Sequence, residues 1–140
     1  MEVHVISRFG SKRNKYHNVK TTTFDGKTHD SCKEARRWAE LNLLQRAGEI
    51  SDLRRQVRFK LIPAQYETIE RYSAKTGKRL KDKQKCIERG VDYKADFVYT
   101  DNRTGKEIVE DTKCKATRTP EYIIKKKLML YLLGIRINEV

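Results

Sequence analysis

The sequence lacks the residue patterns that mark several classes of protein. Its three cysteines are far apart, and the absence of a Cys-x-x-Cys pair argues against a disulfide framework and against a zinc knuckle. The three histidines have no partner at metal-ligand spacing. No glycine-rich nucleotide-binding loop and no Gly-x-Ser-x-Gly motif occurs. Any chemistry of this chain therefore rests on other residue types.

Long apolar runs are also missing. No run approaches the ~18 residues that a membrane-spanning helix needs. No hydrophobic segment follows the N-terminus in the manner of a signal peptide. We therefore expect a soluble protein of the cell interior that has no membrane partner.

Positive charge, in contrast, is abundant. The 140 residues, which suit one domain, include 32 lysines and arginines against 19 acids, so that the formal net charge is +13. A polyanion is the simplest partner, and nucleic acid is the commonest polyanion. We interpret residues 1–20, which include Arg13 and Lys15, as a flexible basic arm that crosses phosphates, with a disordered tail as the alternative. Residues 21–140 then form the single domain.

The stretch Val91–Lys113 predicts a β-hairpin that gathers acids on one face. Apolar and polar residues alternate over 91–99, and the sequence DNRTG supplies a turn. Side chains two apart in a strand share a face, so Asp111 and Lys113 point the same way. Pairing of Asp96 with Asp111 brings two carboxylates and one ammonium together. A register one residue off would place Glu110 beside Asp96 instead.

Two close carboxylates repel each other unless a cation lies between them. Mg²⁺ suits such a site, because it prefers oxygen ligands and is usually held by one or two carboxylates together with phosphate oxygens. Such an ion polarises a phosphodiester and lowers the pKa of a bound water, and a nearby lysine stabilises the transition-state charge. The pattern therefore favours hydrolysis of a nucleic-acid backbone. Surface ion pairs of little energetic consequence are the plain alternative.

These residues resemble a known signature. Asp96 in the sequence ADF, followed by Asp111-Thr112-Lys113, is similar to the core motif of the PD-(D/E)XK nuclease superfamily, with Ala95 where a proline often stands. The resemblance implies a restriction-endonuclease-like core of the α/β (α+β) class, with a small mixed sheet flanked by helices. It also implies Asp96 and Asp111 as ligands of Mg²⁺, with Mn²⁺ as a possible substitute, and Lys113 as a catalytic group.

A helix expected from Ser31 to about Ala47 carries a further acid, Glu34. The resemblance implies a carboxylate on a helix that precedes the hairpin, which makes Glu34 a catalytic residue and a third metal ligand. The segment Ser31 to Glu34 also fits a capping box, in which the glutamate accepts hydrogen bonds from backbone N–H groups at the helix start. The residues alone leave both interpretations open.

Strands and one more helix are expected on either side of the hairpin. Residues 54–62 and 65–72 predict strands, and residues 73–90 predict an exposed basic loop with a helical turn near 82–89. Thr119-Pro120 predicts the start of a helix that ends at Leu133 and turns Ile124, Leu128 and Leu132 inward. Residues 134–140 predict a closing strand.

Basic residues along these elements are expected to contact phosphates, which positions a nucleic acid without reading its bases. The expected contacts are Arg13, Lys15, Lys78, Lys81, Lys115, Lys125 and Lys126.

The function expected from the sequence is that of a Mg²⁺-dependent DNA endonuclease. The order of parts resembles phage Holliday-junction-resolving endonucleases, which implies branched DNA as the substrate, a role in phage recombination or replication, and the cytoplasm of a bacterial host as the location. Symmetric cutting of such a substrate requires two sites, so we expect a homodimer. The alternatives are a non-catalytic DNA- or RNA-binding protein and a nuclease for linear or single-stranded DNA.

Overall fold

A four-stranded sheet lies at the centre of the computed structural model, which describes residues 19–140. Its strands, in spatial order, are β3 (Ile50–Ile62), β6 (Val91–Asp101), β7 (Lys106–Asp111) and β8 (Ile137–Glu139). The first three are antiparallel, and β8 runs parallel to β7. The mixed sheet and its helices confirm the expected α/β (α+β) class. Most of the arm predicted at residues 1–20, including Arg13 and Lys15, lies outside the described residues.

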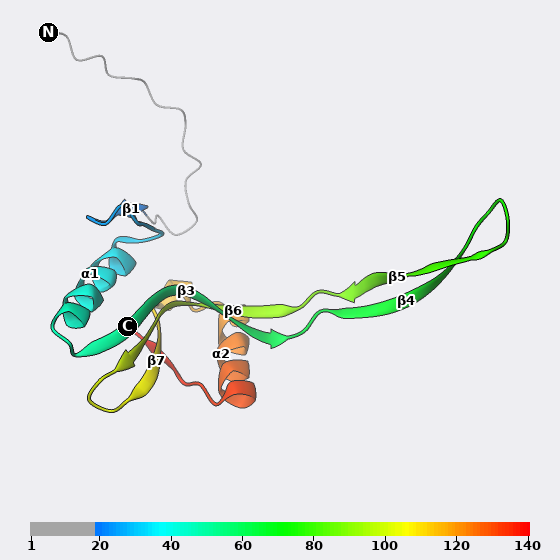
Figure 1. Ribbon diagram of the computed structural model, residues 1–140. Coiled ribbons are helices and arrows are strands. Elements are labelled where there is room, and N and C mark those ends of the chain that lie inside the picture. The colour runs from blue at the N-terminus through cyan, green and yellow to red at the C-terminus, as the bar shows by residue number, and fades with distance from the viewer. Residues whose placement is uncertain (1–18) are drawn as a thin grey trace, which may run out of the picture.

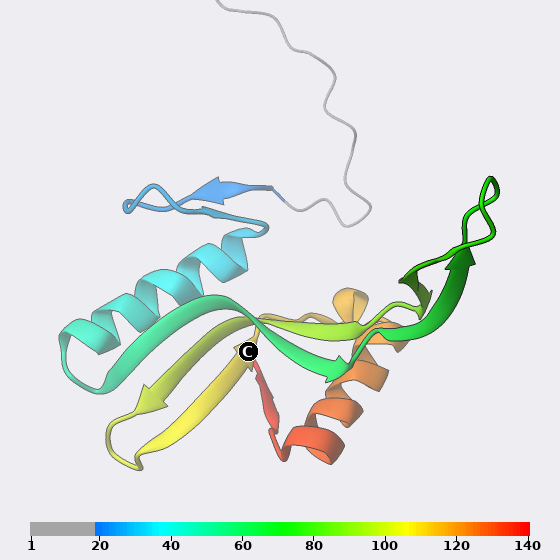
Figure 2. The ribbon, with the colours of Figure 1, turned by 45° about the vertical axis from the view of Figure 1, so that its right-hand side comes forward.

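Two helices cover opposite faces of this sheet (Figure 2). Helix α1 (Cys32–Arg46) packs Trp38 and Leu41 against Phe97 of β6. Helix α2 (Pro120–Leu133) places Tyr122 and Met129 in a second cluster, with residues of β6 and β7. The sheet is therefore buried on both sides where its central strands pass between the helices.

The helix boundaries agree with the sequence prediction because local residues set them. The Ser31 side chain accepts a hydrogen bond from the Glu34 N–H at the start of α1, and Thr119 accepts one from the Tyr122 N–H at the start of α2. Gly134, at φ 67°, ends α2 in the left-handed conformation that glycine adopts without strain.

The predicted inward face of α2 was wrong in part. Ile124 and Leu132 are exposed by 59% and 46%, and Tyr122 and Met129 are buried in their place. The helix carries apolar side chains on nearly every side, so the period of its apolar residues does not identify the face that meets the sheet.

Strand β6 changes the face that it buries at Asp96. Tyr93 and Ala95 belong to the cluster under α2, whereas Phe97 lies in the cluster under α1. Residues on either side of Asp96 pair regularly with β3, but no pairing is recorded between Asp96 and Gln56, which faces it. Gln56 has φ 54°, a conformation that a non-glycine residue rarely adopts in a strand. The pleat is therefore interrupted at one of the predicted metal ligands.

Residues 73–90 do not form the predicted loop. Strands β4 (Gln65–Tyr72) and β5 (Arg79–Glu88) pair into a hairpin that extends away from the sheet and the helices (Figures 1 and 2). The prediction failed because polar residues occupy both faces of β5, so no apolar period marks the segment as a strand.

Three short elements complete the described chain. Strands β1 (Thr21–Thr22) and β2 (Thr28–His29) form a small hairpin that precedes α1, and the 3₁₀ turn η1 (Lys115–Thr117) connects β7 with α2. Within residues 19–140, neither helix combines the length and the apolar character that a membrane-spanning helix requires.

Candidate active site

The pairing of β6 with β7 places Asp96 opposite Asp111. Phe97 pairs with Glu110 at the end of the recorded ladder, so the next positions along the two strands are Asp96 and Asp111. This is the register preferred from the sequence. The alternative register, with Glu110 beside Asp96, is wrong.

Thr112 fixes the orientation of Asp96. The backbone N–H and the hydroxyl of Thr112 both donate to Asp96 Oδ2, over 2.8 and 2.6 Å. Two hydrogen bonds to one oxygen hold the carboxylate in place, while Asp96 as a whole stays partly exposed. The residue between the second acid and the lysine of the motif therefore positions the first acid.

Asp111 is buried and incompletely paired. The Tyr93 hydroxyl donates to Asp111 Oδ2, and Lys113 Nζ lies 3.0 Å from Oδ1. The contact with Lys113 does not have hydrogen-bond geometry, so Oδ1 is a buried oxygen without a hydrogen-bond donor in the described structure. A buried carboxylate oxygen in this condition is costly, and it is available to a ligand that enters the site.

The same environment changes the acidity of Asp111. Burial and then the charge of Asp96 raise the pKa of the Asp111 carboxyl to about 7, against the opposing effects of the Tyr93 hydrogen bond and the Lys113 charge. Burial and the bond to Asp111 also raise the pKa of Tyr93, so its hydroxyl remains a donor at neutral pH. A cation at the two carboxylates would relieve the repulsion and displace the proton of Asp111.

The backbone and one aromatic ring hold Lys113 beside Asp111. The Lys113 N–H donates to the Val140 carbonyl over 3.1 Å, and the Val140 N–H donates to the Asp111 carbonyl over 3.1 Å. Lys113 Nζ also lies 4.7 Å from the centre of the Tyr122 ring, a cation–π distance. The backbone contacts and the ring contact therefore both keep the ammonium close to the Asp111 carboxylate.

An open pocket of about 390 Å³ gives access to these groups. Its lining includes Asp111, Lys113 and Tyr93, and it extends to Arg58, Lys94 and Lys125. Arg58 and Lys94 pair directly across β3 and β6, and like charges in that position destabilise a sheet. An anion bound in the pocket would offset this repulsion.

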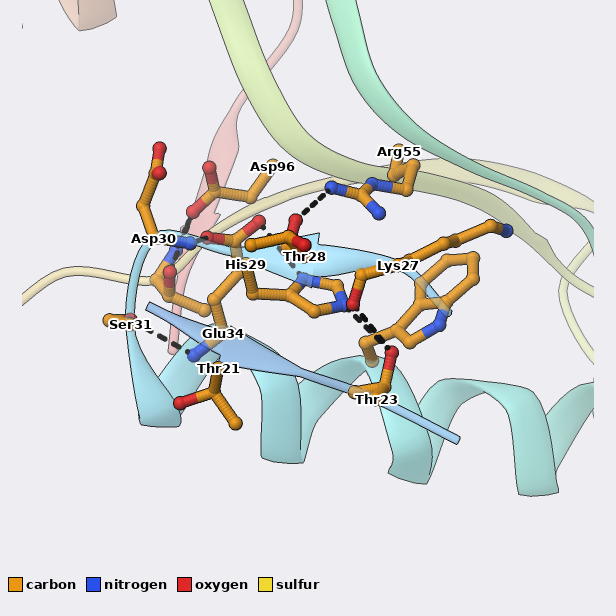
Figure 3. A network of polar contacts seen from close by, with 12 residues as sticks. Thr21, Thr23, Lys27, Thr28, His29, Asp30, Ser31, Glu34, Arg55 and Asp96 are labelled. Atoms are coloured by element: carbon orange, nitrogen blue, oxygen red, sulfur yellow. Dashed lines mark hydrogen bonds and ion pairs between the residues drawn. The ribbon is translucent and has the colours of Figure 1, made fainter. Parts of the chain in front are cut away.

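Glu34 is held by groups at the start of α1. Glu34 Oε1 lies 3.3 Å from His29 Nδ1, and Oε2 accepts from the Asp30 N–H over 3.2 Å (Figure 3). Within the described part of the chain, no three His, Cys, Asp or Glu side chains converge as a metal site. The contacts of Glu34 are those of a helix cap, displaced by one residue from the capping box, so its role as a metal ligand stays a prediction.

The sequence did not single out Tyr93, Arg58 or Lys94 for the site. Tyr93 was assigned only to the apolar face of its strand, although a buried tyrosine hydroxyl usually needs a polar partner. This requirement could have indicated from the sequence that Tyr93 contacts a polar group of the site. Arg58 and Lys94 become neighbours only through the pairing of two strands, which the sequence does not encode locally.

The lysines expected at phosphates are dispersed. Lys78 and Lys81 belong to the β4–β5 hairpin, Lys125 lines the pocket at Asp111, and Lys115 and Lys126 line a larger cavity of about 840 Å³. No carboxylate lines that larger cavity, so it cannot supply the acid chemistry expected of the site. Lys126 Nζ is already paired with Glu139 at 2.6 Å.

The residues present fit one divalent cation. Asp96 and Asp111 provide adjacent oxygen donors, one of them the undonated Oδ1 of Asp111, and this is the ligand chemistry of Mg²⁺ in sites that the substrate completes.

Comparisons with known proteins give one family. The model of the family described as "Protein of unknown function (DUF1064)" matches residues 13–134. No curated protein and no solved structure matches the chain.

Proposed function

We propose that this chain, which belongs to the DUF1064 family, is a metal-dependent endonuclease that hydrolyses phosphodiester bonds in DNA. The observation that carries the proposal is that Asp96, Asp111 and Lys113 come together beside an open pocket, which Asp111 and Lys113 line together with Arg58, Lys94 and Lys125. The spacing of the three residues resembles the PD-(D/E)XK motif, and the order of helix, strands, acidic hairpin and lysine-rich helix supports the same assignment.

Asp96 and Asp111 would hold Mg²⁺, or Mn²⁺ in its place, through their carboxylate oxygens. When bound, the ion would polarise the scissile phosphate and acidify a water molecule. Glu34 would join this set only if its contacts with His29 and the Asp30 backbone were released.

The chain's own groups have separate tasks in this proposal. Thr112 keeps Asp96 oriented, and the Tyr93 hydroxyl keeps Asp111 oriented. Lys113 supplies a positive charge where negative charge develops on the phosphoryl oxygens. Arg58 and Lys94 bind the phosphate backbone beside the cut, which their shared position in the pocket supports.

Branched DNA is the proposed substrate, with phage recombination or replication in a bacterial cytoplasm as the setting. This part rests on the resemblance to junction-resolving endonucleases. A homodimer would provide the second site for a symmetric cut. Exposed apolar side chains on α2, such as the 85% exposed Tyr131, support an interface on that helix.

A non-catalytic nucleic-acid-binding protein is the second candidate. It is favoured by one observation, which is that the described residues bring only two acids and no third to a potential metal site. The acids would then only balance a basic surface.

A cleavage assay separates the two candidates. Plasmid DNA, synthetic four-way junctions and linear duplexes would be incubated with Mg²⁺ and the parent chain, the Asp111→Asn variant or the Glu107→Gln variant. Glu107 is an exposed acid on the same strand, and its substitution is the matched control. We expect cutting by the parent and the control, with the junction cut most efficiently, and binding without cutting by Asp111→Asn. Binding without cutting by all three would establish the non-catalytic alternative.

A further inference from the structure

The β4–β5 hairpin is a two-stranded ribbon without cover. Every residue of both strands is exposed, and the ribbon projects beyond the sheet and both helices (Figures 1 and 2). Neither strand has a substantial contact with any other described element. A lone two-stranded hairpin is at best marginally stable in water, so a partner is needed to order it fully.

The charge of the ribbon indicates the chemistry of that partner. Residues 65–88 contain seven lysines and arginines against four acids. Two of the cations, Lys85 and Arg79, are paired with acids on the ribbon itself. For the other five, no ion pair is recorded within the described part of the chain: Arg71, Lys75, Lys78, Lys81 and Lys83. A polyanion would neutralise them, whereas a second copy of the ribbon would repeat the same charge.

The ribbon pairs cations with aliphatic groups across its two strands. Ile69 pairs with Lys83, and beyond an interruption of the ladder Arg71 pairs with Leu80, so each pair sets an aliphatic side chain beside a basic one. Basic groups bind phosphate oxygens at the walls of a DNA groove, and aliphatic groups contact thymine methyls on its floor. Interruptions of the ladder near both ends of the pairing increase the twist of the ribbon, as a helical groove requires.

The dimensions of the ribbon match duplex DNA. The ten residues of β5 span about 33 Å at ~3.3 Å per residue, close to the ~34 Å of one turn of B-DNA. The major groove of B-DNA admits a two-stranded ribbon, while the major groove of A-form RNA is too narrow. The ribbon emerges from β3 and β6, the strands that carry Gln56 and Asp96.

We propose that the β4–β5 ribbon is a DNA-binding arm that lies in the major groove of a duplex, up to about one helical turn from the bond that is cut. The position of the cut rests on the proposed function, but binding by the arm does not require catalysis. The substrate is then a DNA with a double-stranded stem long enough to reach the arm.

Binding measurements test the arm separately from cutting. The ribbon variant would carry Lys81→Gln and Lys83→Gln. The control would carry Arg103→Gln in the β6–β7 turn and Lys106→Gln at the start of β7, at the other end of the sheet. All four positions are exposed, so both variants should fold. Affinity for duplexes of ~12 and ~30 base pairs would be measured with Ca²⁺ in place of Mg²⁺.

We expect the ribbon variant to bind the long duplex about tenfold more weakly than the parent does. The slope of the logarithm of its binding constant against the logarithm of salt concentration should be smaller by about two. The control should bind as the parent does, and all three proteins should bind the short duplex alike. A second variant, with Asn-Gly joining Ala64 to Arg89 in place of residues 65–88, should show the same loss in larger measure.

Three results would overturn the arm. The ribbon variant could bind the long duplex as tightly as the control does. Double-stranded RNA could show the same gain in affinity with length. The parent could sediment as a dimer that separates when the ribbon is removed, with DNA affinity unchanged. Failure of the parent to cut any DNA would refute the nuclease proposal and leave the arm standing.

Discussion

Glu110 and Asp111 are adjacent in the sequence and buried to the same degree, yet their surroundings are opposite. Glu110 lies under α1, where Arg37 donates to both of its oxygens over 2.9 and 2.8 Å and Tyr99 donates over 2.6 Å. Asp111 lies on the other face, with an undonated oxygen and a raised pKa. The fold supplies hydrogen-bond donors to both oxygens of the Glu110 carboxylate. The Asp111 carboxylate keeps one oxygen without a donor, and a strongly raised pKa of this kind is typical of functional sites.

The difference shows how a strand can supply stability and chemistry from successive residues. Side chains alternate between the faces of a sheet, so one position can connect a helix to the sheet while the next faces a pocket. The variants below test whether the two acids divide these tasks as described.

The largest effect is expected from Glu110→Gln. The change leaves the Arg37 guanidinium beside a neutral amide, and breaking a buried ion pair costs about 3–5 kcal/mol. Urea unfolding should show this loss, whereas Glu107→Gln should change the free energy of unfolding by less than about 0.5 kcal/mol. A Glu110→Gln variant as stable as the parent would contradict the structural assignment of Glu110.

The next effect concerns Asp111→Asn and pH. Because the pKa of Asp111 is raised to about 7 in the folded chain, ionisation of this group destabilises the fold. Relative to the variant, the parent should lose stability as pH rises from about 4 to about 7, by on the order of 2–4 kcal/mol. Unfolding curves of both proteins at several pH values, without divalent ions, provide the measurement. A constant difference between the two would remove the unusual environment of Asp111.

Divalent ions should reverse that penalty. At ~30 times its dissociation constant, Mg²⁺ should stabilise the parent by about 2 kcal/mol and leave Asp111→Asn almost unchanged. The stabilisation should weaken below pH 7, since the ion competes with a proton for Asp111. Thermal unfolding with Mg²⁺ or EDTA measures both effects. Equal stabilisation of parent and variant would place the ion elsewhere.

The smallest effect is expected from Glu34→Gln. The amide oxygen can still accept from the Asp30 N–H, so we expect a loss of stability below about 1 kcal/mol and cleavage within tenfold of the parent. Cleavage rates at saturating Mg²⁺ provide the check. A loss of cleavage as large as that of Asp111→Asn would instead make Glu34 a metal ligand.

Local signals in the sequence predicted the parts of this fold that depend on local contacts. The caps at Ser31 and Thr119 set the helix starts, and the turn after Asp101 sets a register that brings Asp96 to Asp111. Those choices involve residues close in the chain, and so they are visible in the sequence.

Features that depend on distant partners were not predicted. The interruption of the pleat at Gln56 and Asp96 arises where two strands forty residues apart meet. The placement of Arg58 beside Lys94 has the same origin, and the capping contacts of Glu34 involve His29 from a separate strand. The exposed faces of the ribbon gave no hydrophobic period, because no core selects one face over the other.

The two hydrogen bonds of Val140 have a practical consequence. They hold the backbone on both sides of Thr112, so Val140, next to β8, fixes the positions of Asp111 and Lys113. Loss of these two hydrogen bonds would therefore misplace the acid and the amine although neither side chain had been changed.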